Sequence, residues 1–162
     1  MKYPVIISGG GIIGCYIHLR LKQEGIPSLI IEKGLAARES EINIRTISLN
    51  PSTYKLLLDL GIQLETASVN TIKVSDRDGS GKIEFVASEV GEEALSHVAM
   101  FNDLLDKMQD LAKPAIQFES EITSISKLEE LTKITLNNNS ELKTSLLIGS
   151  DGRKSPVAQL SN

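Results

Sequence analysis

The segment that most constrains the fold lies near the start of the chain, where an apolar run meets a cluster of glycines. Val5 to Ile7 are apolar, and glycines follow at positions 9, 11 and 14 with the spacing G-x-G-x-x-G. This order is typical of the turn from a buried strand into a helix that binds a dinucleotide. We expect Gly9 to permit the tight turn, Gly11 to let the backbone approach a pyrophosphate, and Gly14 to let the helix pack closely on the strand.

A helix is predicted directly after these glycines, over residues 12–24. Its apolar stripe is expected to contain Ile13, Ile17 and Leu21, and Gly25 is expected to end it. Free N–H groups and the positive dipole end at the start of such a helix stabilise a diphosphate without a lysine.

A second short strand is predicted over residues 28–31, and Glu32 follows it. An acidic residue at the carboxyl end of this strand can accept hydrogen bonds from ribose hydroxyls, and it argues against a ribose that carries a phosphate. Glycines, strand, helix and acid together predict a βαβ unit that binds a dinucleotide.

The middle of the chain is predicted to contain both helices and strands. A surface loop is expected over residues 33–44, and residues 45–49 are expected to bring the chain back. A helix is then expected to begin at Asn50 or Ser52 and to end at Gly61. Two further runs, 69–75 and 82–86, flank a turn and predict a β-hairpin.

The last third of the chain is predicted to be rich in strands. A helix over residues 102–112 comes first, with Leu104, Leu105, Met108 and Leu111 on its apolar side. Strands are expected at 115–118, 121–126, 131–137 and 141–148. The glycine-rich turn that follows, residues 149–155, places Asp151 at the carboxyl edge of a sheet, where α/β folds bind ligands.

Charge and the rarer residue types exclude several classes of function. A net charge of −4 and the lack of an arginine-rich stripe argue against nucleic-acid binding. No apolar run approaches the length of a membrane span, so a cytoplasmic location is the default, with peripheral contact with a membrane left open. Cys15 has no second cysteine to pair with, and we interpret it as a small buried side chain. His18 and His97 are interpreted as surface or packing residues, and no catalytic or metal-binding residue is assigned.

Several blocks of the chain, taken in order, resemble the N-terminal part of the FAD-dependent aromatic hydroxylases. The glycine motif with Glu32 resembles the first nucleotide motif of this family, residues 45–51 resemble its R-x-x-x-L-S/N-P segment, and residues 147–155 resemble its D-G motif. Residues 72–79, Phe85 and residues 89–91 resemble the ubiquinone-biosynthesis branch, the polyprenyl-methoxyphenol hydroxylases.

The resemblance implies an α/β flavoprotein fold of the glutathione-reductase type, in truncated form. A Rossmann-like FAD-binding βαβ sheet would carry a small β-meander. The FAD-binding domain would comprise residues 1–68 and 101–162, and residues 69–100 would contribute strands to a substrate domain. The cofactor-binding residues that the resemblance implies are Gly9, Gly11, Ile12, Ile13, Gly14, Glu32, Lys33, Arg45, Asp151 and Gly152.

The activity that the resemblance implies is NAD(P)H-dependent, FAD-dependent hydroxylation of a phenolic ring. The flavin carries the difficult chemistry, and the protein positions the ring and excludes water. The substrate would be a small phenolic molecule, and membership of the ubiquinone branch would add a polyprenyl chain and contact with the inner membrane. Family members usually carry an Asn-Arg pair where this chain has Asn102-Asp103.

The family members are well over twice as long as this chain, which stops just after the D-G motif. We expect residues 1–162 alone to lack one wall of the flavin site, to expose apolar surface and to be inactive. A complementary C-terminal chain and a homo-oligomer are both open as partners. Two alternatives also remain open, an NAD-binding Rossmann oxidoreductase and a non-catalytic nucleotide-binding or interaction module.

Overall fold

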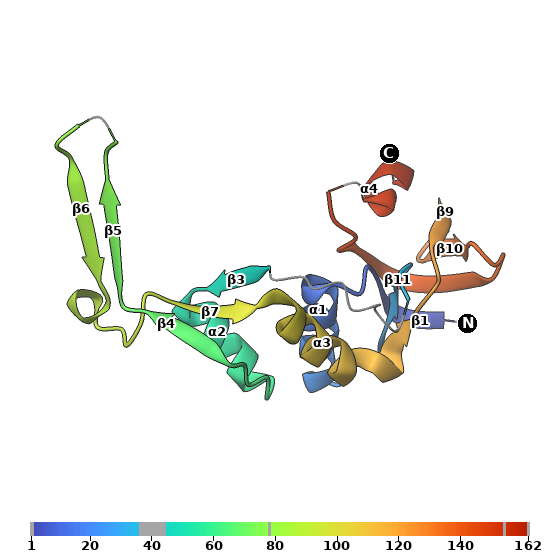
Figure 1. The fold of residues 1–162 in the computed structure, drawn as a ribbon. Helices are drawn as coiled ribbons and strands as arrows, with labels where there is room; N and C mark the ends of the chain where they lie inside the picture. The colour runs from blue at the N-terminus through green and yellow to red at the C-terminus, as the bar shows by residue number, and fades with distance from the viewer. Residues whose placement is uncertain (1, 36–44, 78, 154, 162) are drawn as a thin grey trace. The chain divides into compact units, whose positions relative to one another are not determined.

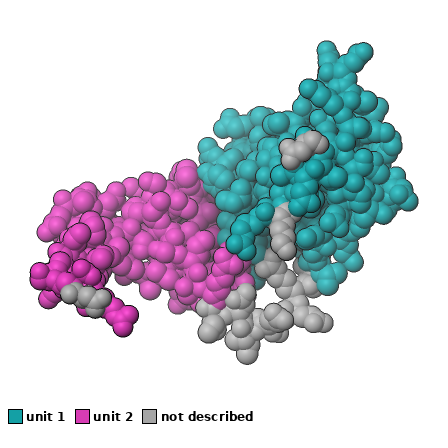
Figure 2. Space-filling model, turned by 90° about the horizontal axis from the view of Figure 1, so that it is seen from above, with its two compact units in different colours: residues 1–41, 105–162 teal, residues 42–104 magenta. Residues whose placement is uncertain are grey.

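The chain divides into two compact units, which are shown in separate colours in Figure 2. The computed structural model describes residues 2–35, 45–77, 79–153 and 155–161. The first unit comprises residues 1–41 and 105–162, and the second comprises residues 42–104. Most of the predicted loop at 33–44 lies outside the described residues.

The first unit is built on a six-stranded mixed sheet with the strand order β8-β2-β1-β11-β10-β9. In chain order its strands are β1 (Lys2–Ser8), β2 (Ser28–Ile31), β8 (Ile116–Gln117), β9 (Ile122–Lys127), β10 (Thr132–Leu136) and β11 (Glu141–Gly149). β1 runs parallel to both β2 and β11, whereas β9, β10 and β11 form an antiparallel meander (Figure 1). β1 therefore belongs to the predicted βαβ unit and also pairs with β11, the last strand of the predicted meander.

The two faces of this sheet are both covered, which explains the uninterrupted apolar run in β1. Val5, Ile6 and Ile7 are all buried, although successive side chains of a strand point to opposite faces. On one face Ile6 packs in a core whose other buried members are Ile31, Ile122, Ile134, Leu136, Leu142 and Val157. On another part of the sheet, helix α1 (Ile12–Gln23) packs against β1 and β2.

Helix α1 forms where it was predicted, but it buries a different face. Its buried residues are Gly14, Cys15, His18 and Leu19. The predicted stripe of Ile13, Ile17 and Leu21 is wrong as the packing face, because Ile13 is 62% exposed and the other two are only half-buried. Close packing at Gly14 turns the face of α1 that carries these four buried residues toward the sheet. His18 is buried, and its Nδ1 lies 2.8 Å from Oγ of Ser28.

The second unit contains a three-stranded antiparallel sheet with the order β3-β7-β4. Its strands are β3 (Thr46–Leu49), β4 (Thr66–Val69) and β7 (Ser96–Met100), and helix α2 (Pro51–Asp59) packs against β3 and β7. Asn50 caps α2, since its Oδ1 accepts a hydrogen bond of 2.8 Å from the N–H of Thr53. His97 on β7 stacks on Tyr54 of α2 with 4.0 Å between the ring centroids, which is a packing role.

A separate two-stranded hairpin in the second unit carries an uncovered apolar face. Strands β5 (Thr71–Ser75) and β6 (Lys82–Val86) pair as the sequence predicts (Figure 1). The side chains on one face are 41–59% exposed although all are apolar: Ile72, Val74, Ile83 and Phe85. The opposite face carries an ion pair of 3.2 Å between Lys73 and Glu84. This alternation is typical of a hairpin with one solvated face and one face meant for burial.

The remaining helices complete the two units. Helix α3 (Phe101–Ala112) contributes residues to both units, and it buries Leu104, Leu105, Met108 and Ala112. Leu111, predicted on this apolar side, is 43% exposed. The short elements are η1 (Ala87–Val90), η2 (Lys113–Ala115) and α4 (Pro156–Leu160). Within the described residues no helix is long and apolar enough to cross a membrane.

Most predicted elements are confirmed, and the differences are one divided strand and two elements that were not predicted. The strands predicted in the last third are all present, and residues 137–140 form the turn between β10 and β11. The predicted strand at 69–75 is instead two strands, because β4 ends at Val69 and pairs with β7. β7 and α4 were not predicted.

Candidate functional site

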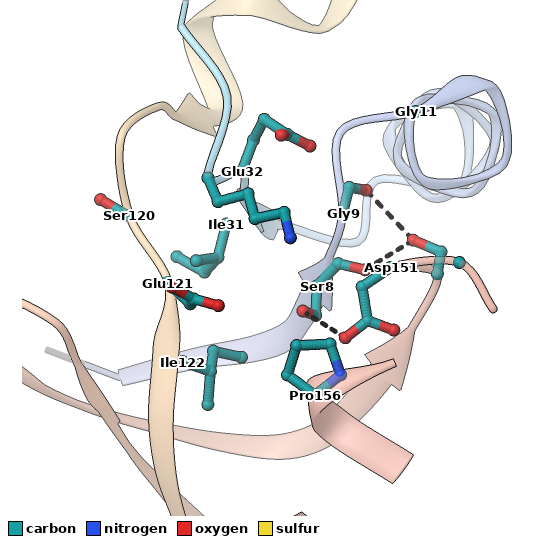
Figure 3. A pocket seen from close by; sticks show the side chains of 13 residues that line it. Ser8, Gly9, Gly11, Ile31, Glu32, Ser120, Glu121, Ile122, Asp151 and Pro156 are labelled. Carbon is teal, nitrogen blue, oxygen red and sulfur yellow. Dashed lines mark hydrogen bonds between the residues drawn. The ribbon is translucent and has the colours of Figure 1, made fainter. Parts of the chain in front are cut away.

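Three chain segments meet at one edge of the six-stranded sheet and form a pocket. They are the glycine turn after β1, the segment after β2 and the turn after β11. The pocket has a volume of about 280 Å³. It is lined by Ser8, Gly9, Gly11, Ile31, Glu32, Lys33, Ser120, Glu121, Ile122, Ser150, Asp151, Gly152 and Pro156. Figure 3 shows Ser120, Glu121 and Ile122 along one side and Ser8, Gly9 and Asp151 along the other.

Gly9 makes the turn that the sequence predicts, and it lies against the second turn. Its φ of +101° falls in the region that favours glycine, and a Cβ there would lie 2.6 Å from the carbonyl oxygen of Ser150. The hydroxyl of Ser150 donates to the carbonyl oxygens of Ser8 at 2.8 Å and Gly9 at 3.1 Å (Figure 3). The turn after β11 therefore holds the turn after β1 in place.

The start of α1 offers backbone donors to the pocket. Gly11 is the N-cap residue and provides no side-chain cap. Within the described part of the chain, the N–H groups of Gly11, Ile12 and Ile13 have no hydrogen-bond acceptor. A Cβ on Gly11 would meet open space, whereas a Cβ on Gly14 would collide with the carbonyl oxygen of Gly9. The helix start thus combines free donors with an uncovered backbone, which suits an anion.

Glu32 faces the glycine turn from the end of β2. Its Oε2 accepts a hydrogen bond of 2.5 Å from the N–H of Gly10, and its Oε1 accepts one of 2.7 Å from the N–H of Gly34. A carboxylate has about four lone-pair positions, so these two bonds leave acceptor capacity for hydroxyl groups of a ligand. Glu32 can therefore shape the turn and bind a polyhydroxylated group at the same time.

Asp151, which lines the same pocket, carries a carboxylate oxygen without a hydrogen-bond partner among the described residues. Its Oδ2 accepts from Oγ of Ser8 at 3.1 Å and from the N–H of Val157 at 3.2 Å. Its Oδ1 is buried and has no hydrogen-bond partner among the residues that the structure describes. A buried carboxylate oxygen without a donor is costly, so a ligand hydroxyl or N–H at this point would stabilise the site.

The structure brings most of the predicted cofactor-binding residues to this pocket. Those that line it are Gly9, Gly11, Glu32, Lys33, Asp151 and Gly152. Ile12, Ile13 and Gly14 lie in the first turn of α1, where their backbone rather than their side chains can contribute. Arg45 belongs to the second unit, where its guanidinium carbon lies 4.2 Å from the centre of the Phe101 ring.

Several residues at the site were missed by sequence reasoning. Ser8 and Ser150 connect the two turns, and Gln109 of α3 donates from Nε2 to the carbonyl oxygen of Gly10 at 2.7 Å. Ser120, Glu121 and Ile122 form the opposite side of the pocket. Apart from Ser150, which lies within the D-G block, none belongs to a recognisable motif. The sequence offered one signal for the two serines. Ser8 directly follows the first predicted strand, and Ser150 lies two residues after the last predicted strand.

The chemistry of these groups fits the ADP half of FAD. Backbone N–H groups suit phosphate oxygens, and the carboxylates of Glu32 and Asp151 suit hydroxyl groups. The buried, unpartnered Oδ1 of Asp151 and the open space above Gly11 are the structural observations that support this fit. Among the described residues no group of three or more His, Cys, Asp or Glu side chains is placed to hold a metal ion.

Comparison with known proteins finds similarity along nearly the whole chain. Residues 2–161 match the family model described as FAD binding domain. Monooxygenase 1 of Arabidopsis thaliana is 30% identical over 161 residues, which cover 95% of this chain and 39% of that protein. The mitochondrial ubiquinone biosynthesis monooxygenase COQ6 of Caenorhabditis elegans is 26% identical over 180 residues, which cover 99% of this chain and 40% of that protein.

Solved structures share the fold of the chain. PqsL, a probable FAD-dependent monooxygenase from Pseudomonas aeruginosa, matches 98% of this chain with a TM-score of 0.79 at 17% identity, over 45% of its own length. HpxO of Klebsiella pneumoniae, in complex with FAD and uric acid, matches 97% of this chain with a TM-score of 0.75 at 21% identity, over 40% of its own length. The chain spans only 39–40% of the length of the curated relatives described above.

Proposed function

Since this chain belongs to the FAD-binding domain family of the flavin-dependent monooxygenases, we propose that the pocket at the edge of its six-stranded sheet binds the ADP half of FAD. The observation that carries this proposal is that Gly11 at the start of α1, Glu32 and Asp151 line one pocket, and that Oδ1 of Asp151 has no partner among the described residues. Bound FAD would supply the redox chemistry.

Each part of the chain has a separate role in this proposal. The N–H groups at the start of α1 bind phosphate oxygens, and Glu32 accepts hydrogen bonds from the adenosine ribose. Asp151 accepts a hydrogen bond through Oδ1 and is held in orientation by Ser8. Lys33, which lines the same pocket, adds a positive charge beside a negatively charged ligand.

We propose further that the complete activity is NAD(P)H-dependent hydroxylation of a phenolic ring in ubiquinone biosynthesis. Similarity to ubiquinone biosynthesis monooxygenases of several organisms supports this choice. The structural relatives act on varied small molecules, since HpxO was solved with uric acid and PqsL with 2-aminobenzoylacetate. The substrate class therefore rests on the sequence relatives and not on the fold.

Residues 69–100 are proposed to contribute strands to a substrate-binding domain. The apolar face of the β5–β6 hairpin supports this, because a two-stranded hairpin is marginally stable by itself in water. Replacing Phe85, which is 50% exposed, by serine should change the free energy of unfolding by less than about 0.5 kcal/mol. The same variant should reduce self-association in light scattering, whereas Lys73→Ser on the opposite face should not. A loss of stability in Phe85→Ser would show that the chain already covers this face.

Titration of purified residues 1–162 with FAD, NAD⁺ and NADH tests the main proposal. We expect the flavin fluorescence to change when FAD binds, and we expect FAD to bind at least as tightly as either nicotinamide nucleotide, since all three contain an ADP group. Glu32→Gln should weaken binding by about fivefold to tenfold, because the neutral amide is a poorer acceptor for ribose hydroxyls. Glu129→Gln, at an exposed position that does not line the pocket, is the matched control.

The outcomes distinguish FAD binding from NAD binding. Tighter binding of NAD⁺ than of FAD would favour an NAD-binding oxidoreductase instead. FAD binding without oxidation of NADH is the result expected of residues 1–162, whereas oxidation of NADH in the presence of phenols would show that this part of the chain is active by itself. A folded chain that binds none of these nucleotides would contradict the proposed function.

A further inference from the structure

Both backbone groups of Gly10 are held by side chains from distant parts of the first unit. The N–H of Gly10 donates to Oε2 of Glu32 at 2.5 Å. The carbonyl oxygen of Gly10 accepts from Nε2 of Gln109 at 2.7 Å and from Sγ of Cys15 at 3.4 Å. Gln109 lies on α3, 99 residues along the chain from Gly10.

The contact with Gln109 also fixes the direction of a donor that faces the pocket. A trans peptide group is planar, and its C=O and N–H point in opposite directions. The carbonyl group of Gly10 shares its peptide group with the N–H of Gly11. Gln109 binds the carbonyl from the side of α3, so the N–H of Gly11 points away from α3. Gly11 lines the pocket, whereas Gln109 does not.

The local sequence makes this contact more important than a single hydrogen bond elsewhere. Residues 9–11 are three consecutive glycines, and glycine has the largest backbone freedom to lose on ordering. A loop that must be ordered at the moment of binding lowers affinity by the entropy of ordering. A loop that is ordered before the ligand arrives avoids this loss.

We propose that Gln109 is a positioning residue that orients the Gly10–Gly11 peptide group, so that the N–H of Gly11 is ready to bind a diphosphate. Gln109 acts through the backbone and does not touch the ligand. This inference rests on the proposed function, because the diphosphate is that of FAD. It assigns a role in nucleotide binding to α3. This helix belongs neither to the glycine motif nor to the D-G turn, and it does not contain Glu32.

Two substitutions separate this role from general packing. Gln109→Met keeps the length of the side chain and removes the donor. Gln109→Glu keeps the shape and places a carboxylate against the carbonyl oxygen of Gly10, which repels it. Asp110→Asn, at an exposed position on the same helix, is the matched control. Circular dichroism and thermal unfolding identify the variants that are folded.

The experiment compares ADP, FAD and adenosine as ligands and follows amide hydrogen exchange in the ligand-free chain. We expect both Gln109 variants to bind ADP and FAD about fivefold more weakly, as for the loss of one hydrogen bond, with Gln109→Glu the weaker. Adenosine, which has no phosphate, should bind all variants alike. The amides of Gly10 and Gly11 should exchange faster in the Gln109 variants without ligand, and Asp110→Asn should match the wild type.

Three results would overturn the inference. If folded Gln109 variants bind ADP within twofold of the wild type, the orientation of this peptide group does not limit binding. If the Gln109 variants lose affinity for ADP and for adenosine equally, the substitutions act on the structure in general and not on the diphosphate-binding peptide group. In both cases FAD binding by the wild-type chain leaves the proposed function standing. If the wild type binds neither FAD nor ADP, the proposed function and this inference fail together.

Discussion

Gly11 and Gly14 occupy the same motif, yet a methyl group at each position would meet different surroundings. A Cβ on Gly14 would collide with the backbone of Gly9, whereas a Cβ on Gly11 would meet no atom within 4 Å. We expect Gly14→Ala to lower the free energy of unfolding by at least about 2 kcal/mol, because a well-packed backbone contact must move apart. Urea unfolding measures this change.

Gly11→Ala is the matched comparison, with the opposite expected profile. Its free energy of unfolding should fall by less than about 1 kcal/mol, because the helix has no side-chain cap to lose. Its affinity for FAD should fall about tenfold, because the new methyl group occupies the space into which a phosphate must come. Equal stability of the two variants would contradict the different roles given to these glycines.

His18 makes the stability of the first unit depend on pH. Burial, with a smaller contribution from the charge of Lys22, lowers the pKa of His18 below its ordinary value. The unfolded chain therefore binds a proton at a higher pH than the folded chain does. Stability from the neutral side chain is complete above a pH of about 6.5 and is lost as the pH falls through the lower pKa of the folded state.

Urea unfolding across this pH range tests the role of His18. The free energy of unfolding of the wild type should decline from about pH 7 downward. His18→Gln keeps a polar partner for Ser28 but cannot titrate, so its decline should be shallower. An equal slope in His18→Gln and the wild type would assign the pH dependence to other groups.

At the scale of single elements, the cap of α2 offers a direct test of a choice that the sequence left open. Asn50 and Ser52 were both candidates, and the structure gives the capping hydrogen bond to Asn50. Asn50→Ala should lower the free energy of unfolding by about 1 kcal/mol, since the N–H of Thr53 loses its acceptor. Ser52→Ala should change it by less than about 0.5 kcal/mol. Urea unfolding compares the two, and the reverse order would place the cap at Ser52.

How well the sequence predicts the structure also differs from element to element. Runs such as Leu29-Ile30-Ile31 and punctuating residues such as Gly25 were enough to locate the strands and helices. The buried face of α1 was not predictable from hydrophobicity, because close approach at Gly14 buries Cys15 and His18 and leaves Ile13 exposed. β7 has the sequence Ser-His-Val-Ala-Met, which shows no apolar alternation, and it is a strand because two partners flank it.

The same distinction applies to the candidate site. Gly9, Glu32 and Asp151 were predictable because they lie in recognisable motifs at the ends of strands. Ser8, Ser150 and Gln109 were not, because their roles arise from contacts across 99 to 143 residues of the chain. Such contacts depend on which strands become neighbours, and no local pattern encodes that choice.

At the scale of the whole molecule, the sheet of the first unit depends on its last strand. β11 lies between β1 and β10 in the sheet order. A chain shortened to residues 1–140 lacks β11 and should lose cooperative unfolding of the first unit, because β1 then has a neighbour on one side only. A chain shortened to residues 1–160 should retain it. Thermal unfolding followed by far-ultraviolet circular dichroism compares them, and cooperative unfolding of the shorter chain would contradict this role.

The pairing of β1 with β11 also sets the order of events during synthesis. Lys2 pairs with Lys143 and Ile7 with Ile148, so β1 leaves the ribosome 141 residues before the strand with which it pairs. At ordinary rates of translation this interval is on the order of ten seconds. During this interval β1 lacks its partner β11, and the nascent chain exposes the apolar edge formed by Val5, Ile6 and Ile7. A chaperone that binds apolar nascent segments therefore has a defined early target in this chain, and that target disappears when β11 arrives.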